Sequence, residues 1–285
     1  MNENTVELRI MQESDFPECL RLRQQTGWNQ TITDWQRFLS LNPAGCFITT
    51  CGDNTTGTAC TVPYEDRFGW VSMVIVDQDH QRKGIGTKLL LAGIEHLENC
   101  GLTVKLDATP AGKMLYDSLG FHDEYGVARM ECDCIQLSGD AIPCPSLTIN
   151  DLDQLDQYDA PLFGASRKPV LQSYLHHYAT YAFCAKIEGR ITGYVMAREG
   201  GNAFHIGPWV ADDASTAQSL LNTVISHRKP ERIFIDIIEP NINVRNMLQK
   251  MAFKEQRPFI RMYKGVNDNP GKPELIYGLS GPELG

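Results

Sequence analysis

Residues 71–87 have the sequence VSMVIVDQDHQRKGIGT, and the rest of the chain is organised around them. The first six are apolar or small and rich in β-branched side chains, which predicts a short buried strand. From Thr87 onward, apolar residues recur at helical spacing as far as Leu97, and the Asn-Cys-Gly of residues 99–101 is typical of a helix end. The stretch therefore predicts a strand, a basic turn with two glycines, and the N-terminus of a helix.

Such a turn is suited to binding an anion. The first amides of a helix have no carbonyl partner within it, and the helix dipole adds partial positive charge, so a phosphate or pyrophosphate is favoured there. Gly84 and Gly86 let a bulky anion approach the backbone without an intervening Cβ. Two common phosphate motifs are excluded. A dinucleotide fingerprint needs a third glycine where this chain has Leu89, and a P-loop needs its lysine after the glycine, whereas Lys83 precedes Gly84.

The turn resembles motif A of the GNAT superfamily of acyl-CoA N-acyltransferases. That motif is Gln/Arg-x-x-Gly-x-Gly/Ala, and it is matched here by Gln81, Gly84 and Gly86. The preceding Val76-Asp77 and the amphipathic helix that follows also fit the motif. The alternative interpretation is an ordinary strand-turn-helix unit with two turn glycines.

A second segment, residues 107–121, resembles motif B of the same superfamily. Motif B is a helix that carries Leu-Tyr and ends in Gly-Phe, and these pairs are present as Leu115-Tyr116 and Gly120-Phe121. Where the superfamily often has an asparagine, this chain has Thr109, so the resemblance does not imply a contact between this side chain and pantetheine. Together the two motifs extend the resemblance from about residue 6 to about residue 134.

The composition is that of an acidic globular protein. The chain has 285 residues, enough for two domains, with 42% hydrophobic and 21% charged residues. Its net charge of −9 and pI near 5.3 argue against general binding to nucleic acid or to anionic membranes. An anionic cofactor must therefore be held locally, by backbone amides together with Arg82, Lys83 and Lys88. No apolar stretch reaches the roughly 18 residues of a spanning helix and residues 1–4 lack a signal-peptide core, so we expect a cytoplasmic protein.

The cysteines do not indicate a metal site. There are nine, an odd number, and most of them, such as Cys46, Cys60 and Cys184, lie inside apolar runs, which predicts reduced and partly buried thiols. Cys132 and Cys134 alternate on an expected strand, and no second Cys or His pair follows at zinc-finger spacing. We therefore expect no bound metal, and nothing in the sequence marks a cysteine as a nucleophile.

The residues before the central stretch predict the start of an α/β domain. Residues 6–10 alternate between apolar and polar as a half-buried strand does, and helix signals follow at Pro17 and around Trp35. Further along, the pattern predicts strands over residues 45–51 and 56–64 and a polar turn over residues 65–69.

The second half of the chain repeats the first. Met251-Ala252-Phe253 takes the place of Leu119-Gly120-Phe121, and Arg261-Met262 takes that of Arg129-Met130, with the same offset of 132 residues. The second copy lacks the anion-binding turn. Asp212-Asp213 follows its central strand with no glycine pair and no basic residue, and two acidic side chains repel a pyrophosphate.

The resemblance implies an α/β (α+β) chain of two tandem GNAT folds, each with a mixed, mostly antiparallel central sheet flanked by helices. The second copy resembles the degenerate acetyltransferase-like domain that follows a functional GNAT domain in other bacterial proteins, and we expect it to shape the acceptor site or to fix assembly. The predicted parts are an acetyl-CoA-binding catalytic domain (1–138), a linker (139–147), a degenerate GNAT-like domain (148–264) and a tail (265–285) that is either packed across a domain or disordered.

The resemblance also implies a donor, acetyl-CoA or another acyl-CoA, lying along the central strand. Its pantetheine would pair with the backbone near Ile75 and Val76, and its pyrophosphate would lie on the amides of the glycine turn. An amine would attack the thioester, and a backbone N–H of the strand would stabilise the oxyanion. Tyr116, with a reference pKa of about 10, would protonate the departing thiolate. The implied cofactor-binding set is Ile75, Val76, Gln81, Arg82, Lys83, Gly84, Ile85, Gly86 and Thr87.

The expected acceptor is a primary amine of a small molecule or a peptide. In the superfamily the segment between the first two helices lies over the acceptor, which makes Trp28 a candidate wall, with ordinary packing as the alternative. Glu65 and Asp66 are candidates to contact an amine, although such a pair is more often a solvated hairpin tip. Glu65, Asp66, Asp107 and His122 are also candidate bases for removing the ammonium proton.

Other functions stay open at this stage. One alternative is a non-catalytic acyl-CoA-binding sensor or scaffold that keeps the fold without turnover. Another is an acceptor with a thiol or a hydroxyl in place of an amine. A homodimer is one hypothesis for the assembly of the chain.

Overall fold

The structure, a computed structural model, describes residues 5–133, 143–228 and 231–285. By its internal contacts the chain divides into two compact units, residues 1–106 and 107–285. Within the described ranges, no helix is long and apolar enough to cross a membrane.

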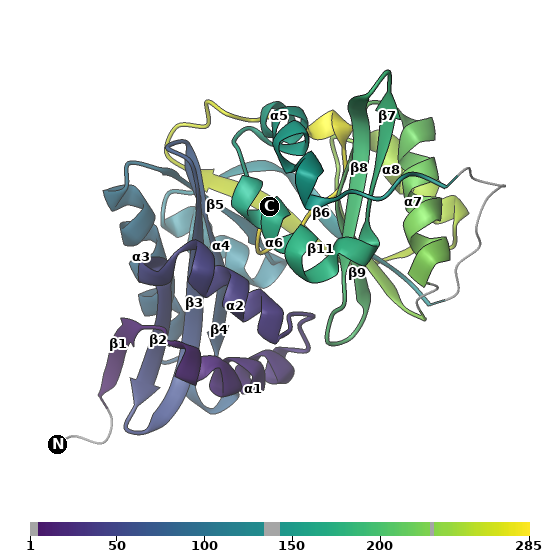
Figure 1. The fold of residues 1–285 in the computed structure, drawn as a ribbon. Helices are drawn as coiled ribbons and strands as arrows, with labels where there is room; N and C mark the ends of the chain where they lie inside the picture. Colours follow the sequence, from purple (N-terminus) through teal and green to yellow (C-terminus); the bar gives the residue numbers. More distant parts are fainter. Residues whose placement is uncertain (1–4, 134–142, 229–230) are drawn as a thin grey trace. The chain divides into compact units, whose positions relative to one another are not determined.

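The first unit is a sheet with helices on both faces (Figure 1). Its strand order is β1-β2-β3-β4-β5, and neighbours are antiparallel except for β4 and β5, which are parallel. Helices α1 and α2 cover one face and α3 covers the other. The elements are β1 (Val6–Ile10), η1 (Glu13–Asp15), α1 (Phe16–Thr26), α2 (Ile32–Leu41), η2 (Pro43–Gly45), β2 (Cys46–Cys51), β3 (Asn54–Tyr64), β4 (Phe68–Val76), η3 (Gln78–His80), α3 (Ile85–Asn99) and β5 (Thr103–Ala108).

The central strand β4 begins earlier than the sequence predicts. The predicted turn over residues 65–69 is wrong by two residues, because Phe68 and Gly69 already belong to β4. Phe68 pairs with Tyr64 and is buried. A Cβ at Gly69 would lie 2.5 Å from a methyl carbon of Leu97 on α3, so this glycine allows the helix to pack closely on the strand.

The second unit is also a sheet with helices on both faces. Its strand order is β11-β6-β10-β9-β8-β7, with β12 paired to β9, and only β9 and β10 are parallel. Helices α5 and α6 cover one face and α7 covers the other (Figure 1). The elements are α4 (Pro110–Ser118), β6 (His122–Cys132), η4 (Ile149–Asp151), α5 (Leu152–Phe163), α6 (Lys168–Tyr178), η5 (Ala179–Tyr181), β7 (Ala182–Ile187), β8 (Arg190–Arg198), β9 (Phe204–Ala211), α7 (Ala214–Arg228), β10 (Ile233–Ile238), α8 (Ile242–Lys250), β11 (Lys254–Lys264), η6 (Pro273–Leu275) and β12 (Ile276–Gly278).

The compact units do not divide at the linker predicted over residues 139–147. Strand β6 belongs in sequence to the first copy, yet it pairs with β10 and β11 in the second unit. Part of that linker, residues 139–142, lies outside the described residues. Within the described part of the linker, the Leu147 N–H donates to the Ala182 carbonyl of β7 at 2.8 Å. The predicted boundaries follow the repeat in the sequence, whereas the compact units follow strand pairing.

The two copies share a hydrogen-bond pattern as well as an order of elements. At the end of its central strand, the first copy has the Asp77 N–H donating to the Thr56 carbonyl at 2.9 Å. The second copy has the Asp212 N–H donating to the Thr192 carbonyl at the same distance. The tandem repeat predicted from the sequence is therefore confirmed in the backbone.

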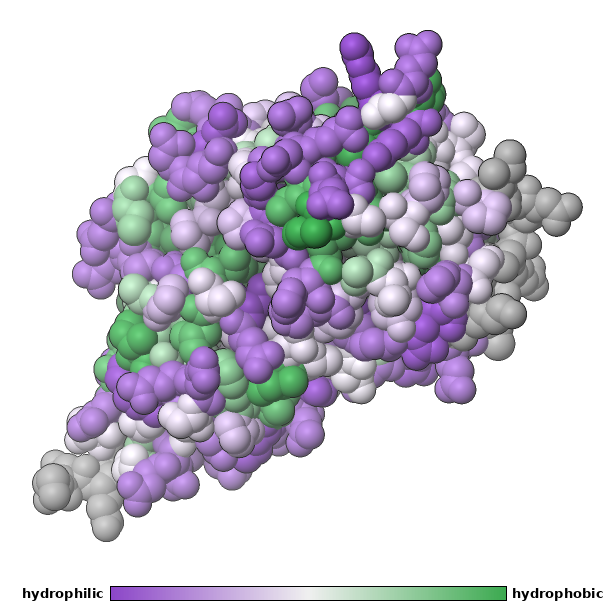
Figure 2. Space-filling view, in the orientation of Figure 1, coloured by the Kyte–Doolittle hydropathy of each residue, from purple (hydrophilic) through white to green (hydrophobic). Residues whose placement is uncertain are grey.

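The cores lie between each sheet and its helices. In the first unit Phe47 and Ala59 of the sheet pack on Ile85 and Leu89 of α3. On the face shown in Figure 2, hydrophilic residues dominate and hydrophobic ones form small separate areas, in keeping with the net charge of −9.

Candidate active site

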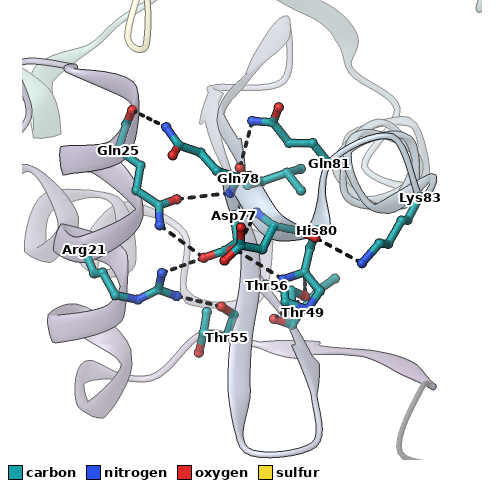
Figure 3. Close-up of polar contacts among 12 residues, drawn as sticks. Arg21, Gln25, Thr49, Thr55, Thr56, Asp77, Gln78, His80, Gln81 and Lys83 are labelled. Atoms are coloured by element: carbon teal, nitrogen blue, oxygen red, sulfur yellow. Dashed lines mark hydrogen bonds and ion pairs between the residues drawn. The ribbon is translucent and has the colours of Figure 1, made fainter.

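Asp77 follows β4 directly and fixes helix α1 to the end of the central strand (Figure 3). Its carboxylate accepts hydrogen bonds from Arg21 and Gln25 of α1, at 2.5 and 3.3 Å, and lies 3.2 Å from Nδ1 of His80. It also accepts from the backbone N–H of Asp79 at 3.0 Å, which shapes η3. Helix α1 and the turn that follows β4 are therefore held by one carboxylate.

The Asp77 carboxylate stays charged at neutral pH. Burial alone would raise its pKa, because the residue is only 6% exposed. Hydrogen bonds from Arg21, His80, the Asp79 amide and Gln25 outweigh burial and lower the pKa of Asp77 to about 2. A charged carboxylate, held by hydrogen bonds from α1 and from η3, therefore lies at the start of the glycine turn.

The glycine turn has a backbone that ordinary residues seldom adopt. Gly84, the N-cap of α3, has a φ of +80°, and Arg82 before it has a φ of +59° although it carries a side chain. Gly86 has an ordinary φ, and a Cβ there would lie 3.3 Å from a methyl carbon of Val76, a tight contact that a small shift of the valine would relieve. The turn therefore brings the start of α3 close against the end of β4.

This geometry leaves a row of donors at the start of α3. The first helical bond runs from the Lys88 N–H to the Gly84 carbonyl, and no side chain in the described ranges caps the helix. Among the described residues, the amides of Ile85, Gly86 and Thr87 have no acceptor. Such a row is a ready site for an anion.

The basic side chains around the turn are only partly available. Lys83 donates to the Asp79 carbonyl at 3.0 Å, and Lys88 donates to the Val6 carbonyl at 2.7 Å. Arg82 is exposed, and within the described residues no acceptor contacts its guanidinium. Of the three cations expected to help hold an anion, Arg82 is the one that makes no other contact with a residue that the structure describes.

Strand β4 parts from β5 soon after the two begin. Their parallel pairing covers only Phe68 to Trp70 of β4. Further along, Met73 forms a bulge with a φ of +53°, and its carbonyl accepts a hydrogen bond from the Thr58 hydroxyl at 2.8 Å. Among the described residues no strand pairs with residues 71–76 on the side away from β3. This edge of β4 contains the predicted pantetheine contacts, Ile75 and Val76.

Tyr116 lies on α4 with its ring against Phe121, the ring centroids being 5.9 Å apart. Burial raises the pKa of the Tyr116 hydroxyl, so the group is protonated at neutral pH. In the described part of the chain no group hydrogen-bonds to that hydroxyl. A Cβ at Gly112 would lie 2.9 Å from the ring, so this glycine makes room for it. Thr109 caps α4 by accepting from the Gly112 N–H at 3.3 Å.

The candidate acceptor residues differ in their surroundings. Trp28 lies between α1 and α2, half-buried, and its carbonyl accepts from Arg23 at 3.3 Å. Glu65 and Asp66 form the exposed tip of the β3–β4 hairpin, where Glu65 lies 3.6 Å from Arg67. The tip is at the beginning of β4, and nine residues of strand, roughly 25 to 30 Å, separate it from the glycine turn.

The other two candidate bases also differ from each other. Asp107 is buried and accepts two hydrogen bonds from the Arg261 guanidinium, both at 2.9 Å. Arg261 also donates to the Tyr125 hydroxyl at 2.9 Å. Burial works against the charge of Arg261, but Asp107 and Tyr125 outweigh it and raise its pKa. Asp107 is therefore committed to an ion pair, whereas His122 is exposed, with Tyr263 5.8 Å from its ring.

Several residues that shape the site are not evident from the sequence. Arg21 and Gln25 contact Asp77 across more than fifty residues of chain, and nothing local distinguishes them from other polar residues of an amphipathic helix. The bulge at Met73 likewise has no local signal, because methionine is common in buried strands. Gly112 has a weak one, as a glycine inside the motif B helix.

Comparisons with known proteins agree on one family for both copies. A model described as the acetyltransferase (GNAT) family matches residues 8–121, and one described as an acetyltransferase (GNAT) domain matches residues 155–278. The uncharacterised N-acetyltransferase YitH of Bacillus subtilis (strain 168) is 25% identical over 98% of both chains.

Solved structures give the same architecture over the whole chain. The "putative acetyltransferase" of Pyrococcus horikoshii has a TM-score of 0.86 at 22% identity, covering 98% of this chain and 96% of that one. A tandem GNAT protein from the clavulanic acid biosynthesis pathway has a TM-score of 0.63 at 12% identity, covering 93% of this chain and all of that one. With one family model on each half and the fold shared from end to end, the chain belongs to the GNAT family of acyl-CoA-dependent N-acetyltransferases and carries two of its domains in tandem.

Proposed function

We propose that the first copy binds acetyl-CoA, or another acyl-CoA, and transfers the acyl group to a primary amine of a small molecule or a peptide. The observation that carries this proposal is the row of acceptor-free amides at Ile85, Gly86 and Thr87. These amides suit the CoA pyrophosphate because they lie at a helix N-terminus with the exposed Arg82 beside them.

The pantetheine arm fits the edge of β4. Its two amide groups are donors and acceptors of the same kind as a peptide backbone, and they can pair with Ile75 and Val76 as a neighbouring strand would. The bulge at Met73 turns the backbone just before these residues, at the point where the thioester of the cofactor would lie. A backbone N–H there would stabilise the oxyanion of the tetrahedral intermediate.

The reaction proposed is direct attack. The amine nitrogen forms a bond to the thioester carbon, the carbon–sulfur bond breaks, and the sulfur leaves as a thiolate. Tyr116 gives the thiolate a proton and regains one from solvent; its hydroxyl is protonated at neutral pH and has no hydrogen-bond partner among the described residues. Asp107 is held by Arg261, and Glu65 and Asp66 lie on an exposed hairpin tip, so of the candidate bases His122 is left to take the ammonium proton of the acceptor, with solvent as the alternative.

The first test is the stoichiometry of CoA and its dependence on the glycine turn. Isothermal titration should give one CoA for each chain. Gly86→Asp should weaken binding at least about tenfold, because it replaces charge-assisted hydrogen bonds, each worth roughly 1.5 to 3 kcal/mol, with a like charge. Leu91→Asp, an exposed change on the same helix, is the matched control and should bind CoA as the parent does. Unchanged affinity in a folded Gly86→Asp protein would refute this site.

The second test is turnover. Release of CoA from acetyl-CoA should be measured against a panel of amines, with thiols and alcohols of matched size in parallel. Acceleration by amines alone supports the proposed acceptor class. Acceleration by a thiol or an alcohol and by no amine would overturn it.

A further inference from the structure

In the second copy, β12 lies where the parallel strands β9 and β10 part. The pairing of β9 with β10 covers only Phe204 and His205 of β9. Beyond it, β12 pairs with β9 through Trp209 and Val210, and the Leu279 N–H donates to the Asp236 carbonyl of β10 at 2.8 Å. One short segment therefore bonds to both strands at their splayed ends.

This position has a counterpart in the first copy. The matched hydrogen bonds after each central strand align Asp77 with Asp212. By that alignment Val210 corresponds to Ile75, one of the two predicted pantetheine contacts. Both central strands also bulge just before this point, at Met73 in the first copy and at Gly207-Pro208 in the second. Segment β12 thus lies on the second copy's equivalent of the pantetheine edge.

The segment is bound through side chains as well as backbone. Arg167, which is 1% exposed, donates to the Ser280 hydroxyl at 3.1 Å, and Tyr174 donates to the Ser280 carbonyl at 3.0 Å. Arg198 donates to the Glu283 carboxylate at 2.9 Å, in an ion pair that is buried on both sides. These contacts bind the segment at Ser280 and at Glu283, both beyond the end of β12.

The backbone approach is too close for any ordinary side chain. A Cβ at Gly207 of β9 would lie 1.8 Å from the Leu279 carbonyl oxygen, so a glycine is required where the segment crosses the strand. The apolar side chains of the segment, Ile276, Tyr277, Leu279 and Leu284, are each at most 5% exposed. A segment buried to this extent is a resident part of the unit and not a mobile strap.

At the start of α7, a side chain of the protein lies where the first copy has its row of acceptor-free amides. In the first copy the N-cap of α3 is Gly84, and the first amides of the helix have no acceptor among the residues that the structure describes. In the second copy Asp213 stands at the N-cap of α7, and its carboxylate accepts from the N–H groups of Ser215 and Thr216 at 2.8 and 2.9 Å. Hydrogen bonds from the Ser215 hydroxyl and the Thr216 amide lower the pKa of Asp213, so a fixed anion occupies the helix N-terminus.

We infer that the second copy is a GNAT domain whose acyl-CoA site is permanently filled by the chain itself. Residues 276–285 take the place of the pantetheine arm, and the Asp213 carboxylate takes the place of the pyrophosphate. The site of the second copy is therefore a peptide-binding site whose ligand is a short strand, residues 276–278, followed by a turn that carries the buried Glu283. The comparison with pantetheine rests on the function proposed for the first copy.

Hydrogen exchange on the full chain tests this inference. The amides of Leu279, Leu284 and Gly285 should be protected, and saturating CoA should leave their exchange rates unchanged. Glu283→Gln should accelerate the exchange of Leu284 and Gly285 by about tenfold or more, because it removes the charge that Arg198 binds. Glu274→Gln, an exposed glutamate on η6, is the matched control and should have no effect.

A chain ending at Leu275 provides the complementary test. A synthetic peptide of residues 276–285 should bind this shortened chain and raise its melting temperature, whereas the same peptide with Leu279→Asp should not. If the shortened chain does not fold, the exchange experiment decides alone. The inference is overturned if the amides of Leu279, Leu284 and Gly285 exchange at unprotected rates, if CoA accelerates their exchange, or if titration gives two CoA for each chain. Failure of the proposed function is distinguishable, since no CoA would then bind while these amides stay protected.

Discussion

Replacing Asp77 with asparagine removes the charge that fixes α1 and the glycine turn to the end of β4 without changing the shape of the side chain. The pKa of Asp77 is lowered from its ordinary 3.8 to about 2. At about 1.4 kcal/mol for each pH unit, this difference corresponds to about 2.5 kcal/mol of stability at pH 7. The side chain of Arg21 is 38% exposed, so solvent screens part of the interaction. We therefore expect Asp77→Asn to lose about 1 to 2.5 kcal/mol.

The pH dependence of that loss follows from the direction of the shift. A carboxyl with a lowered pKa in the folded state contributes its stability above the unfolded pKa of about 4, and the contribution is lost as pH falls toward about 2. Urea unfolding at pH 7, 5, 4 and 3 should show a constant difference between parent and Asp77→Asn down to about pH 4, and a smaller one at pH 3. Asp66→Asn, on the exposed hairpin tip, should match the parent throughout. A difference that did not change with pH, or one below about 0.5 kcal/mol at pH 7, would refute the reasoning.

Two further substitutions test separate parts of the molecule. Tyr116→Phe should lower kcat and kcat/KM together, by about 10² or somewhat less because a CoA thiolate is a fair leaving group, with the Kd for CoA unchanged. Parental turnover with the best acceptor would make Tyr116 a packing residue. Arg261→Met should cost about 3 to 5 kcal/mol in urea unfolding, because it leaves the Asp107 carboxylate buried without its partner, and Arg261→Met with Asp107→Asn should recover part of that loss. A loss under about 1 kcal/mol would mean that water reaches Asp107, or that its carboxyl, whose pKa burial already raises, takes up a proton.

The local parts of the site are those that the sequence predicts. The strand-turn-helix unit around Gly84 and Gly86 is specified by residues within thirty positions, so its periodicity and its glycines are sufficient to locate it. Gly69 shows how such a prediction fails. A glycine before an apolar run usually indicates a turn, but here its missing side chain accommodates Leu97 of α3, which only the packed structure reveals.

The non-local parts of the fold have no such signal. Strand β6 has the pattern of any half-buried strand, and nothing in it specifies pairing with β10 and β11 of the second unit. Strand β12 has three residues, too few for a periodicity, and its place depends on Gly207, about seventy residues earlier. Arg21 and Asp77 are likewise distant in sequence. In each of these three cases the contact joins segments that are distant in sequence and forms only when the sheet is assembled. The residue pattern of one segment therefore does not predict which segment it will contact.

The two copies together suggest what acyl-CoA contributes to the first. Parallel strands that part leave backbone groups and apolar surface that need partners. The second copy supplies these from the chain, through residues 276–285 and Asp213, whereas the described part of the chain supplies no strand for the edge of residues 71–76 that faces away from β3. Bound CoA would complete the first unit, and at a hundred times its Kd it would stabilise that unit by about 2.7 kcal/mol. Exchange of the β4 amides that open only with the unit should then slow by up to about a hundredfold on adding CoA, while the β9 amides stay unchanged. Equal slowing of both strands would show that the second copy also responds to the cofactor, which an internally filled site does not allow.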